Sequence, residues 1–285
     1  MTDQEWQLIY HTIRSVERGF SRPVRRCTYS DVLIIAMYIW TVAHDRPLCW
    51  GVERGSYHRG FRPRRLPSYS QFKRRVRSPR FEQFLAAVNA RLADRQIPTP
   101  VMYVDGKALP VSPVSQDPDA HAGRIAGGFA RGYKLHALVT QDGRFVDFSI
   151  TALNGCEKRE AQRLLERTAL GPIVLADGNY DAAALYETAL TRRTLFFAKA
   201  RPGAGTGHCP QSSARLFCLS LYVNGEPPLY YLRREVERYF GQLTCFGGGL
   251  GPLPAWVRRQ PRVRRWVTAK LALYHARLKT RTSAA

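Results

Sequence analysis

The sequence predicts an α/β fold with a helical domain at its N-terminus. Residues 1–98 place apolar side chains at helical spacing and show no run that is typical of a strand. A proline-containing stretch, Gln96 to Pro100, then reads as a linker. From residue 101 onward, short apolar β-prone runs alternate with helical segments. We therefore expect a helical domain over residues 1–98 and an α/β domain over residues 99–285 that ends in a basic helix.

Three helical segments are expected in the first domain. Apolar residues recur at helical spacing between Gln4 and Val16. Candidate N-cap residues at Thr28–Asp31 precede the apolar run Val32 to Ala43, which is too short to span a bilayer and therefore reads as a core helix. Ser68 opens a third helical stretch, in which aromatic and aliphatic residues are interleaved with basic ones.

The second domain alternates strands and helices. Strands are expected at residues 101–105, 133–140, 144–151, 173–177 and 194–198, the second and third of them forming a hairpin around Gln141-Asp142-Gly143. Helices are expected at residues 157–168, 181–190, 230–243 and 262–279, where the third is amphipathic and Asp181 reads as an N-cap. Loops are expected at residues 110–128, 201–211 and 247–254. Residues 216–223 fit either a strand or a helix.

The charge balance points to a polyanionic partner. The chain carries 44 Lys and Arg against 22 Asp and Glu, a net charge of +22. Arg54 to Arg80 holds ten of the basic residues and no acid, and ten more follow Glu237, again without an acid. A solvated basic face is the simpler alternative, but the absence of balancing acids favours a phosphate-binding surface, most readily nucleic acid. A membrane surface fits less well, because no long basic amphipathic helix stands out.

Cysteine usage and the first residues of the chain predict a cytoplasmic protein. The six cysteines form no CxxC pair, and no histidine cluster completes a zinc pattern, so scattered reduced thiols are expected. The first residues lack a basic leader followed by an apolar run.

Three acidic residues are candidates for a metal site. Asp105 and Asp177 each end an apolar strand, where ligand sites of α/β proteins open. Glu237 lies on the amphipathic helix, and helical steps place it on one face with Tyr230 and Arg233. An all-oxygen ligand set suits Mg²⁺ or Mn²⁺. The alternatives are turn formation by each aspartate before its glycine and a solvated surface glutamate.

In this order and spacing, the motifs resemble those of the DDE transposases of bacterial insertion sequences. The resemblance rests on Tyr103-Val104-Asp105-Gly106, on Leu175 to Asp181, and on a Tyr-x2-Arg-x3-Glu signature at Tyr230, Arg233 and Glu237. Gly132 to His136 is similar to the strand that precedes the hairpin in that family. The similarity covers roughly residues 100–280, and the helical N-terminal part is similar more loosely.

The resemblance implies a ribonuclease-H-like mixed sheet flanked by helices and a two-metal site on Asp105, Asp177 and Glu237, with Mg²⁺ as the expected ion and Mn²⁺ as the alternative. It also implies that Tyr230 and Arg233 contact DNA phosphate. Three positions depart from the family pattern. Thr244 stands where a lysine is usual, Gly178-Asn179 follows the second acid in an uncommon order, and Cys156-Glu157 replaces a His-Asp or His-Glu pair.

The sequence thus predicts a DNA transposase that cleaves phosphodiesters at element ends and joins the freed 3′-hydroxyl to target DNA. Its partners are expected to be double-stranded DNA, at element ends and target, and a second copy of the chain, in the nucleoid and not at a membrane. The residues predicted to contact DNA are Tyr230, Arg233, Lys134, His136, Arg62, Arg64, Arg65, Lys73, Arg74, Arg75, Arg258, Arg259 and Arg262. Trp256, Trp266 and Tyr230 are candidates to stack on an unpaired base, although core packing is the stronger reading for both tryptophans.

Three other functions stay open at this stage. A catalytically inactive DNA-binding relative would keep the fold and the charge, and a nuclease-only relative would cut without joining ends. An RNA-binding structural protein has only the charge in its favour.

Overall fold

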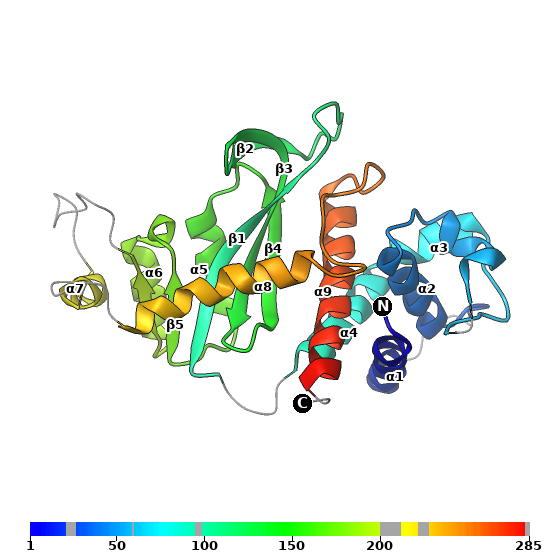
Figure 1. Ribbon diagram of the computed structural model, residues 1–285, viewed down its shortest axis with the longest axis horizontal. Coiled ribbons are helices and arrows are strands. Elements are labelled where there is room, and N and C mark those ends of the chain that lie inside the picture. Colours follow the sequence, from blue (N-terminus) through cyan, green and yellow to red (C-terminus); the bar gives the residue numbers. More distant parts are fainter. Residues whose placement is uncertain (21–26, 59, 95–98, 200–211, 222–227, 283–285) are drawn as a thin grey trace. The chain divides into compact units, whose positions relative to one another are not determined.

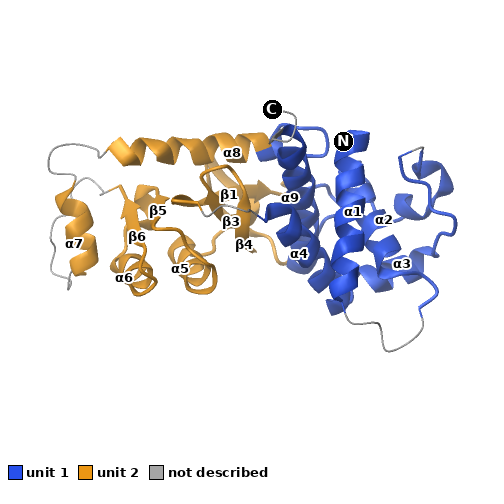
Figure 2. Ribbon diagram, turned by 90° about the horizontal axis from the view of Figure 1, so that it is seen from below, with its two compact units in different colours: residues 1–94, 243–285 blue, residues 95–242 orange. Residues whose placement is uncertain are grey.

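The chain forms two compact units in a computed structural model that describes residues 1–20, 27–58, 60–94, 99–199, 212–221 and 228–282. Unit 1 combines Met1–Asp94 with Leu243–Ala285, and unit 2 is Arg95–Gln242 (Figure 2). The sequence grouped the C-terminal basic helix with the α/β domain. The structure instead groups it with the N-terminal helices, because it packs against three of them. Most of the predicted linker, Gln96 to Pro98, lies outside the described residues.

Unit 1 is helical. Its α-helices are α1 (Asp3–Gly19), α2 (Asp31–Ala43), α3 (Tyr69–Val76), α4 (Pro79–Ala93) and α9 (Gln260–Thr282), and two 3-10 turns, η1 (Trp50–Val52) and η2 (Arg54–Ser56), follow α2. α9 packs against α1, α2 and α4 (Figure 1). Thr2, Ser30, Ser68 and Ser78 each accept a hydrogen bond from a backbone N–H of the helix that follows, which fixes where these helices begin. Among the residues described, no helix has both the length and the apolar character needed to cross a bilayer.

One buried lysine links three parts of unit 1. The Lys270 ammonium on α9 donates to Asp45 Oδ1 at 2.6 Å and to the carbonyls of Val42 at 3.0 Å and Gly248 at 2.9 Å. A buried cation is tolerated only where it is neutralised and hydrogen bonded, and these partners meet that need. The contact fixes the ends of α2 and of the 247–250 loop against the middle of α9.

Unit 2 is built on a six-stranded mixed sheet. Its strands are β1 (Val101–Pro110), β2 (His121–Ile125), β3 (Gly128–Thr140), β4 (Phe145–Ala152), β5 (Ile173–Ala176) and β6 (Leu195–Ala198). β1 is central, with β3 antiparallel on one side and β5 parallel on the other. β4 and β2 pair antiparallel with β3, and β6 pairs parallel with β5. The antiparallel meander β1-β3-β4 beside the parallel pair β5-β6 is the strand order of a ribonuclease-H-like sheet.

Helices cover both faces of this sheet. They are α5 (Glu157–Arg167), α6 (Ala183–Thr191), α7 (Ser213–Ser220) and α8 (Glu235–Thr244), with 3-10 segments η3 (Gly178–Tyr180) and η4 (Pro228–Arg234). α5 and α6 lie on one face and α8 crosses the other (Figures 1 and 2). Phe240 of α8 packs edge-on against Phe145 of β4, with ring centroids 5.2 Å apart. Tyr239 of α8 lies near Tyr103 of β1 and donates its hydroxyl to the Gln141 carbonyl.

Several expectations need correction. The 110–128 segment is not all loop, because β2 forms there and turns into β3 through Gly127 and Gly128, both at positive φ. The 216–223 segment is helical as far as it is described, within α7. The expected helix over 230–243 begins as the 3-10 segment η4 and becomes α-helical only at Glu235. The loop expected at residues 201–211 lies outside the described residues.

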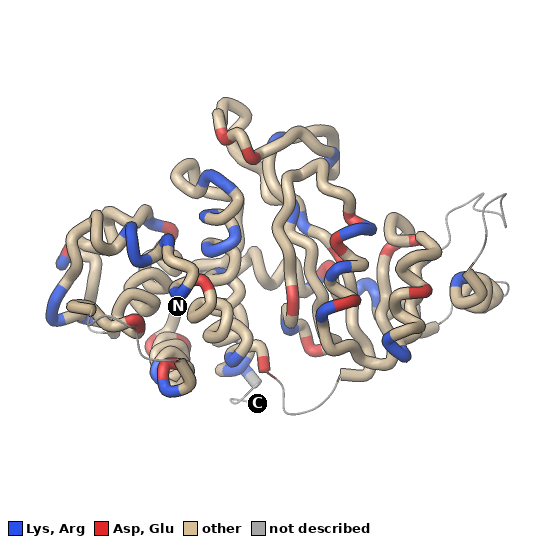
Figure 3. Tube along the Cα trace, turned by 180° about the vertical axis from the view of Figure 1, so that it is seen from behind, with Lys and Arg blue, Asp and Glu red and all other residues tan. Residues whose placement is uncertain are grey.

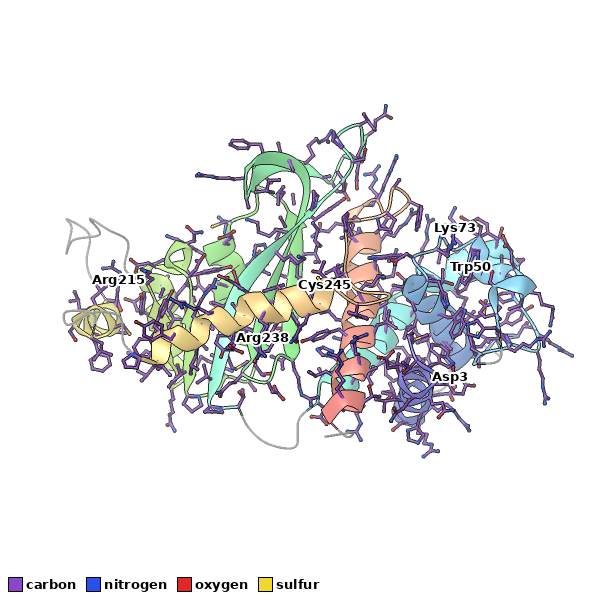
Figure 4. The ribbon with its side chains drawn as sticks, viewed as in Figure 1. Asp3, Trp50, Lys73, Arg215, Arg238 and Cys245 are labelled. Atoms are coloured by element: carbon purple, nitrogen blue, oxygen red, sulfur yellow. The ribbon has the colours of Figure 1, made fainter. Side chains whose placement is uncertain are left out.

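Asp181 does not cap α6, as the sequence suggested. The N-cap position is Ala182, which makes no side-chain bond. Asp181 instead forms a bidentate ion pair with Arg215 of α7, with both N–O distances 2.8 Å (Figure 4). This pair ties α7 to the sheet end, because a buried guanidinium and carboxylate satisfy each other's charge and hydrogen bonds.

Candidate active site

The sheet brings the first two acids together. Val104 of β1 is in register with Ala176 of β5, and the next residues on the two parallel strands are Asp105 and Asp177. Neighbouring strands lie about 4.8 Å apart, so both carboxylates start from adjacent backbone positions. Asp177 also begins η3, where its Oδ1 accepts the Asn179 N–H at 2.8 Å. The turn-forming role and the site role therefore coexist in this residue.

Asp105 lies in an environment that disfavours its charge. Burial is the main cause that raises its pKa to about 6; Arg233 and the Gly106 N–H lower the pKa, while Asp177 and Glu157 raise it further. Arg233 Nη2 lies 3.0 Å from Asp105 Oδ2. A carboxyl that is buried beside other carboxylates needs a cation, and Arg233 supplies one here.

The Tyr-x2-Arg-x3-Glu signature fastens the third acid to the first two. Arg233 Nη1 lies 2.9 Å from Glu237 Oε1, so one guanidinium bridges Asp105 and Glu237. The Tyr230 hydroxyl donates to the Ala176 carbonyl at 2.8 Å, directly before Asp177. Burial alone would lower the pKa of Arg233, but Asp105 and Asp177 outweigh it and the pKa is raised. The Glu237 carboxylate is 73% exposed and faces solvent.

A fourth carboxylate, Glu157, also lies in this site and was not singled out from the sequence. It begins α5, and its Oε1 lies 2.5 Å from Lys134 Nζ on β3. Its charge is one of those that raise the pKa of Asp105. The available signal was its position, since Cys156-Glu157 occupies the place where the resembling family often has an acidic pair.

A buried phenol lies beneath Asp105. Tyr180 is fully buried, and its hydroxyl has no hydrogen-bond partner within the described part of the chain. Burial is the main cause that raises the pKa of Tyr180 well above its usual value, and the charges of Asp105, Glu157 and Asp177 add to it. A Cβ on Gly106 would lie 3.5 Å from the Tyr180 hydroxyl oxygen, an ordinary contact distance, so this oxygen lies close to the β1 backbone beside Asp105.

Asp105, Glu157 and Glu237 line an open cleft in unit 2 with a volume of about 1010 Å³. The cleft is lined by both signs of charge. Its charged lining residues are Asp105, Glu157, Glu237, Lys107, Arg124, Lys134 and Lys158. The acids of the lining thus come from β1, α5 and α8, with cations beside them, which suits a substrate that carries negative charge.

The donor chemistry of the site fits a hard divalent ion. Asp105, Asp177 and Glu237 offer only oxygens, and burial has left Asp105 in need of a positive charge. Within the described residues, however, no three His, Cys, Asp or Glu side chains lie close enough to form a ligand cluster, because Arg233 stands between Asp105 and Glu237. The guanidinium occupies the electrostatic position that an ion would take.

The residues predicted to contact DNA fall into three groups. His136 is wrong, because it is 1% exposed and its Nε2 lies 2.9 Å from the Thr151 hydroxyl inside the sheet. The side chains of Arg75, Lys134, Arg233 and Tyr230 are engaged with Asp31, Glu157, the site acids and Ala176, respectively. The exposed or half-exposed residues are Arg62, Arg64, Arg65, Lys73, Arg74, Arg258, Arg259 and Arg262, all in unit 1 (Figure 3).

The sheet order and the positions of the acids define the class of protein: a ribonuclease-H-like fold with carboxylates in the middle of β1, directly after β5 and on a crossing helix. A comparison with protein families matches residues 97–250 to the family described as "Transposase DDE domain". The match covers more than half of the chain, so the chain belongs to the DDE transposase family and is a DNA transposase. Membership implies dependence on a divalent metal ion.

The comparisons with curated proteins and with solved structures do not add to this family assignment. No curated protein matches the sequence. Among solved structures, the chain is similar to one described as "Cryo-EM structure of piggyBac transposase synaptic complex with hairpin DNA", with a TM-score of 0.48 and 8% identity over 98% of this chain and 72% of that chain. That likeness is too remote for any property of the other protein to be transferred.

Proposed function

We propose that this transposase uses Asp105, Asp177 and Glu237 to hold Mg²⁺, with Mn²⁺ as the alternative ion. The observation that supports this is the single guanidinium of Arg233 that bridges Asp105 and Glu237, with Asp177 next to Asp105 in strand register. Bound ions would supply Lewis acidity toward a phosphodiester and lower the pKa of attacking water. The same site would then serve DNA cleavage at an element end and joining of the freed 3′-hydroxyl to target DNA.

The chain's own residues have separate roles in this proposal. Arg233 neutralises the carboxylates of Asp105 and Glu237, and it would become available to a DNA phosphate once those carboxylates are otherwise neutralised. Lys134, which pairs with Glu157, lines the cleft, and its ammonium would contact the DNA backbone. Tyr230 acts as a positioning residue, because its hydroxyl donates a hydrogen bond to the Ala176 carbonyl. Thr244, in the place of the family's lysine, offers no charge.

Unit 1 is proposed to hold DNA. Its exposed arginines and lysines come from two segments distant in sequence, residues 62–74 and 258–262, and phosphate contacts of this kind position a protein without reading bases. We further propose that two copies of the chain act together on double-stranded DNA, each handling one element end. A chromosomal substrate would place the protein in the bacterial cytoplasm, at the nucleoid.

The test is Asp177→Asn, assayed for Mg²⁺-dependent nicking of a labelled duplex and, separately, for binding of the same duplex in Ca²⁺. We expect nicking to be lost and binding to stay within about twofold, because the carboxylate is exchanged for an amide of equal size. Asp94→Asn, an exposed partner of Arg91 at 3.5 Å, is the matched control and should retain both. Nicking that survives Asp177→Asn would refute the proposed metal site.

An assay with pre-cut DNA ends distinguishes a transposase from a nuclease-only relative and from a catalytically inactive one. A nuclease-only relative would nick the duplex but fail to join a supplied 3′-hydroxyl end to target DNA. A catalytically inactive relative would bind and do neither. The proposal requires that both nicking and joining depend on Asp177.

A further inference from the structure

A small pocket in unit 1 shares no lining residue with the cleft of unit 2 and has no role in the chemistry described above. Its floor is formed by Tyr38 and Trp266, which are buried in the helical core. Its rim comes from the end of α2, from α3, from the loop before α9, and from the first turns of α9. The two basic segments that the sequence singled out therefore meet at this one place.

Two aromatic side chains at this pocket are exposed to solvent. Tyr69 is 44% exposed and Trp256 is 40% exposed, among the few large apolar side chains that unit 1 leaves at its surface. Lys73 Nζ on α3 lies 5.5 Å from the centre of the Tyr69 ring (Figure 4). The backbone of Trp256 is held by Arg262, whose Nη1 donates a hydrogen bond to the Trp256 carbonyl oxygen at 2.5 Å. An exposed aromatic with a fixed backbone is suited to stacking, since little conformational freedom is lost on contact.

The charge of the pocket is of one sign. Its lining includes Arg46, Lys73, Arg77, Arg262 and Arg265 and no acidic residue. Arg265 is 8% exposed; its Nη1 pairs with Glu82, but its Nε is buried without a hydrogen-bond partner among the described residues. A buried N–H without an acceptor is costly and marks a place where an acceptor from outside would be stabilised.

We infer that this pocket captures an unpaired nucleobase of the DNA substrate, stacked on Trp256 and Tyr69, with the flanking phosphates on the surrounding cations. The inference rests on the proposal that DNA binds unit 1. The cavity is small, about 100 Å³, so one planar ring lying against its exposed aromatic rim suits it better than a larger ligand. A paired base cannot enter such a cavity, so the pocket would select a base that is bulged, single-stranded or extruded from the duplex.

The test compares two fluorescent 30-base-pair DNA probes, one fully paired and one with a single bulged thymine, bound to the full chain in Ca²⁺. The wild-type protein should prefer the bulged probe by about 10-fold, the range for one stacked base. Trp256→Ala and Tyr69→Ala should each remove most of this preference while leaving affinity for the paired probe within about twofold. Trp256→Phe, which keeps a ring, should restore it. Phe217→Ala, at an exposed aromatic of α7 in unit 2, is the matched control and should retain the preference.

Each outcome decides one of the two proposals. If the paired probe does not bind at all, the proposal that DNA binds unit 1 is overturned, and this inference with it. If the paired probe binds but the bulge gives no preference, or if the preference survives both alanine variants in proteins with unchanged melting temperature, only the base pocket is overturned.

Discussion

The cleft of unit 2 and the aromatic pocket of unit 1 differ in how their charged side chains are partnered. In the cleft, Arg233 and Lys134 are mostly buried, and each has a carboxylate partner within 3.0 Å. At the pocket, the cations lie around exposed rings, and no acid lines the cavity. Buried, paired charges depend on one another, so removal of one disturbs the rest, whereas exposed cations act nearly independently. The cleft should therefore give large, coupled mutational effects, and the basic surface of unit 1 small, additive ones.

The largest expected effect is on cleavage. Asp105→Asn should lower Mg²⁺-dependent nicking by about 10²–10³-fold or more, the scale for removing one preorganised electrostatic group from an active site. Duplex binding in Ca²⁺ should change little, because the DNA-binding surface proposed for unit 1 is untouched. Single-turnover nicking rates measure the effect. A variant that nicks within 10-fold of the wild type would show that the cleft is not the catalytic centre.

The next effect is on stability, at a titratable group in the sheet below the cleft. Burial is the main cause that lowers the pKa of His136 to about 4, and the pKa of an unfolded histidine is about 6.5. The stability that neutral His136 contributes is fully present above pH 6.5 and is lost as the pH falls toward 4. Between pH 7 and pH 5, the wild type should lose about 2 kcal/mol relative to His136→Gln, which keeps a side chain able to hydrogen bond to Thr151.

Urea unfolding of both proteins across this pH range measures that difference. The comparison with a variant is needed because Asp105 acts in the other direction. Its pKa is raised to about 6, so its ionisation costs stability above pH 6 and that cost disappears as the pH falls. Parallel stability curves for the wild type and His136→Gln would show that His136 does not stay neutral in the folded protein.

A smaller effect concerns competition for the carboxylates. Arg233→Ala should strengthen Mn²⁺ binding by about 10-fold, the scale of one partly buried cation removed from the site, even though the variant is a poor nuclease. Arg233→Lys keeps the charge but not the forked geometry of the guanidinium, so its Mn²⁺ affinity should lie between those of the wild type and Arg233→Ala. Isothermal titration calorimetry with Mn²⁺ measures this affinity without requiring catalysis. Weaker Mn²⁺ binding by Arg233→Ala would mean that the guanidinium supports the ligands instead of competing for them.

The smallest effect is expected on the basic surface. Arg64→Ala, at an exposed arginine of unit 1, should reduce DNA affinity only about threefold for any sequence and lower the salt dependence of binding by about one unit. Anisotropy titrations at several salt concentrations measure both. The equivalent change at Arg167, which pairs with Asp147 on unit 2, should alter neither. A sequence-dependent loss at Arg64 would mean that this residue reads bases.

The sequence was sufficient for what depends on local pattern. Apolar strand runs identified Asp105 and Asp177, although β1 continues past Asp105 to Pro110 and only Asp177 follows a strand end. Helical steps placed Glu237 with Arg233, and turn residues identified the hairpin. What it missed depends on tertiary packing. Glu157 begins a helix whose sequence gives no sign of a site, and it joins the other acids only because α5 begins beside β1 and β3. His136 was predicted to contact DNA because Gly132 to His136 resembles a strand of the family, yet its side chain is buried and hydrogen bonds to Thr151.

The attachment of Glu237 has a consequence for how such chains diversify. The third acid is positioned by side-chain tethers, Tyr230 to Ala176 and Arg233 to Asp105, and not by the path of the polypeptide that leads to it. Changes within α7, which is held by its own ion pair from Arg215 to Asp181, should therefore leave Glu237 and the reactive centre in place.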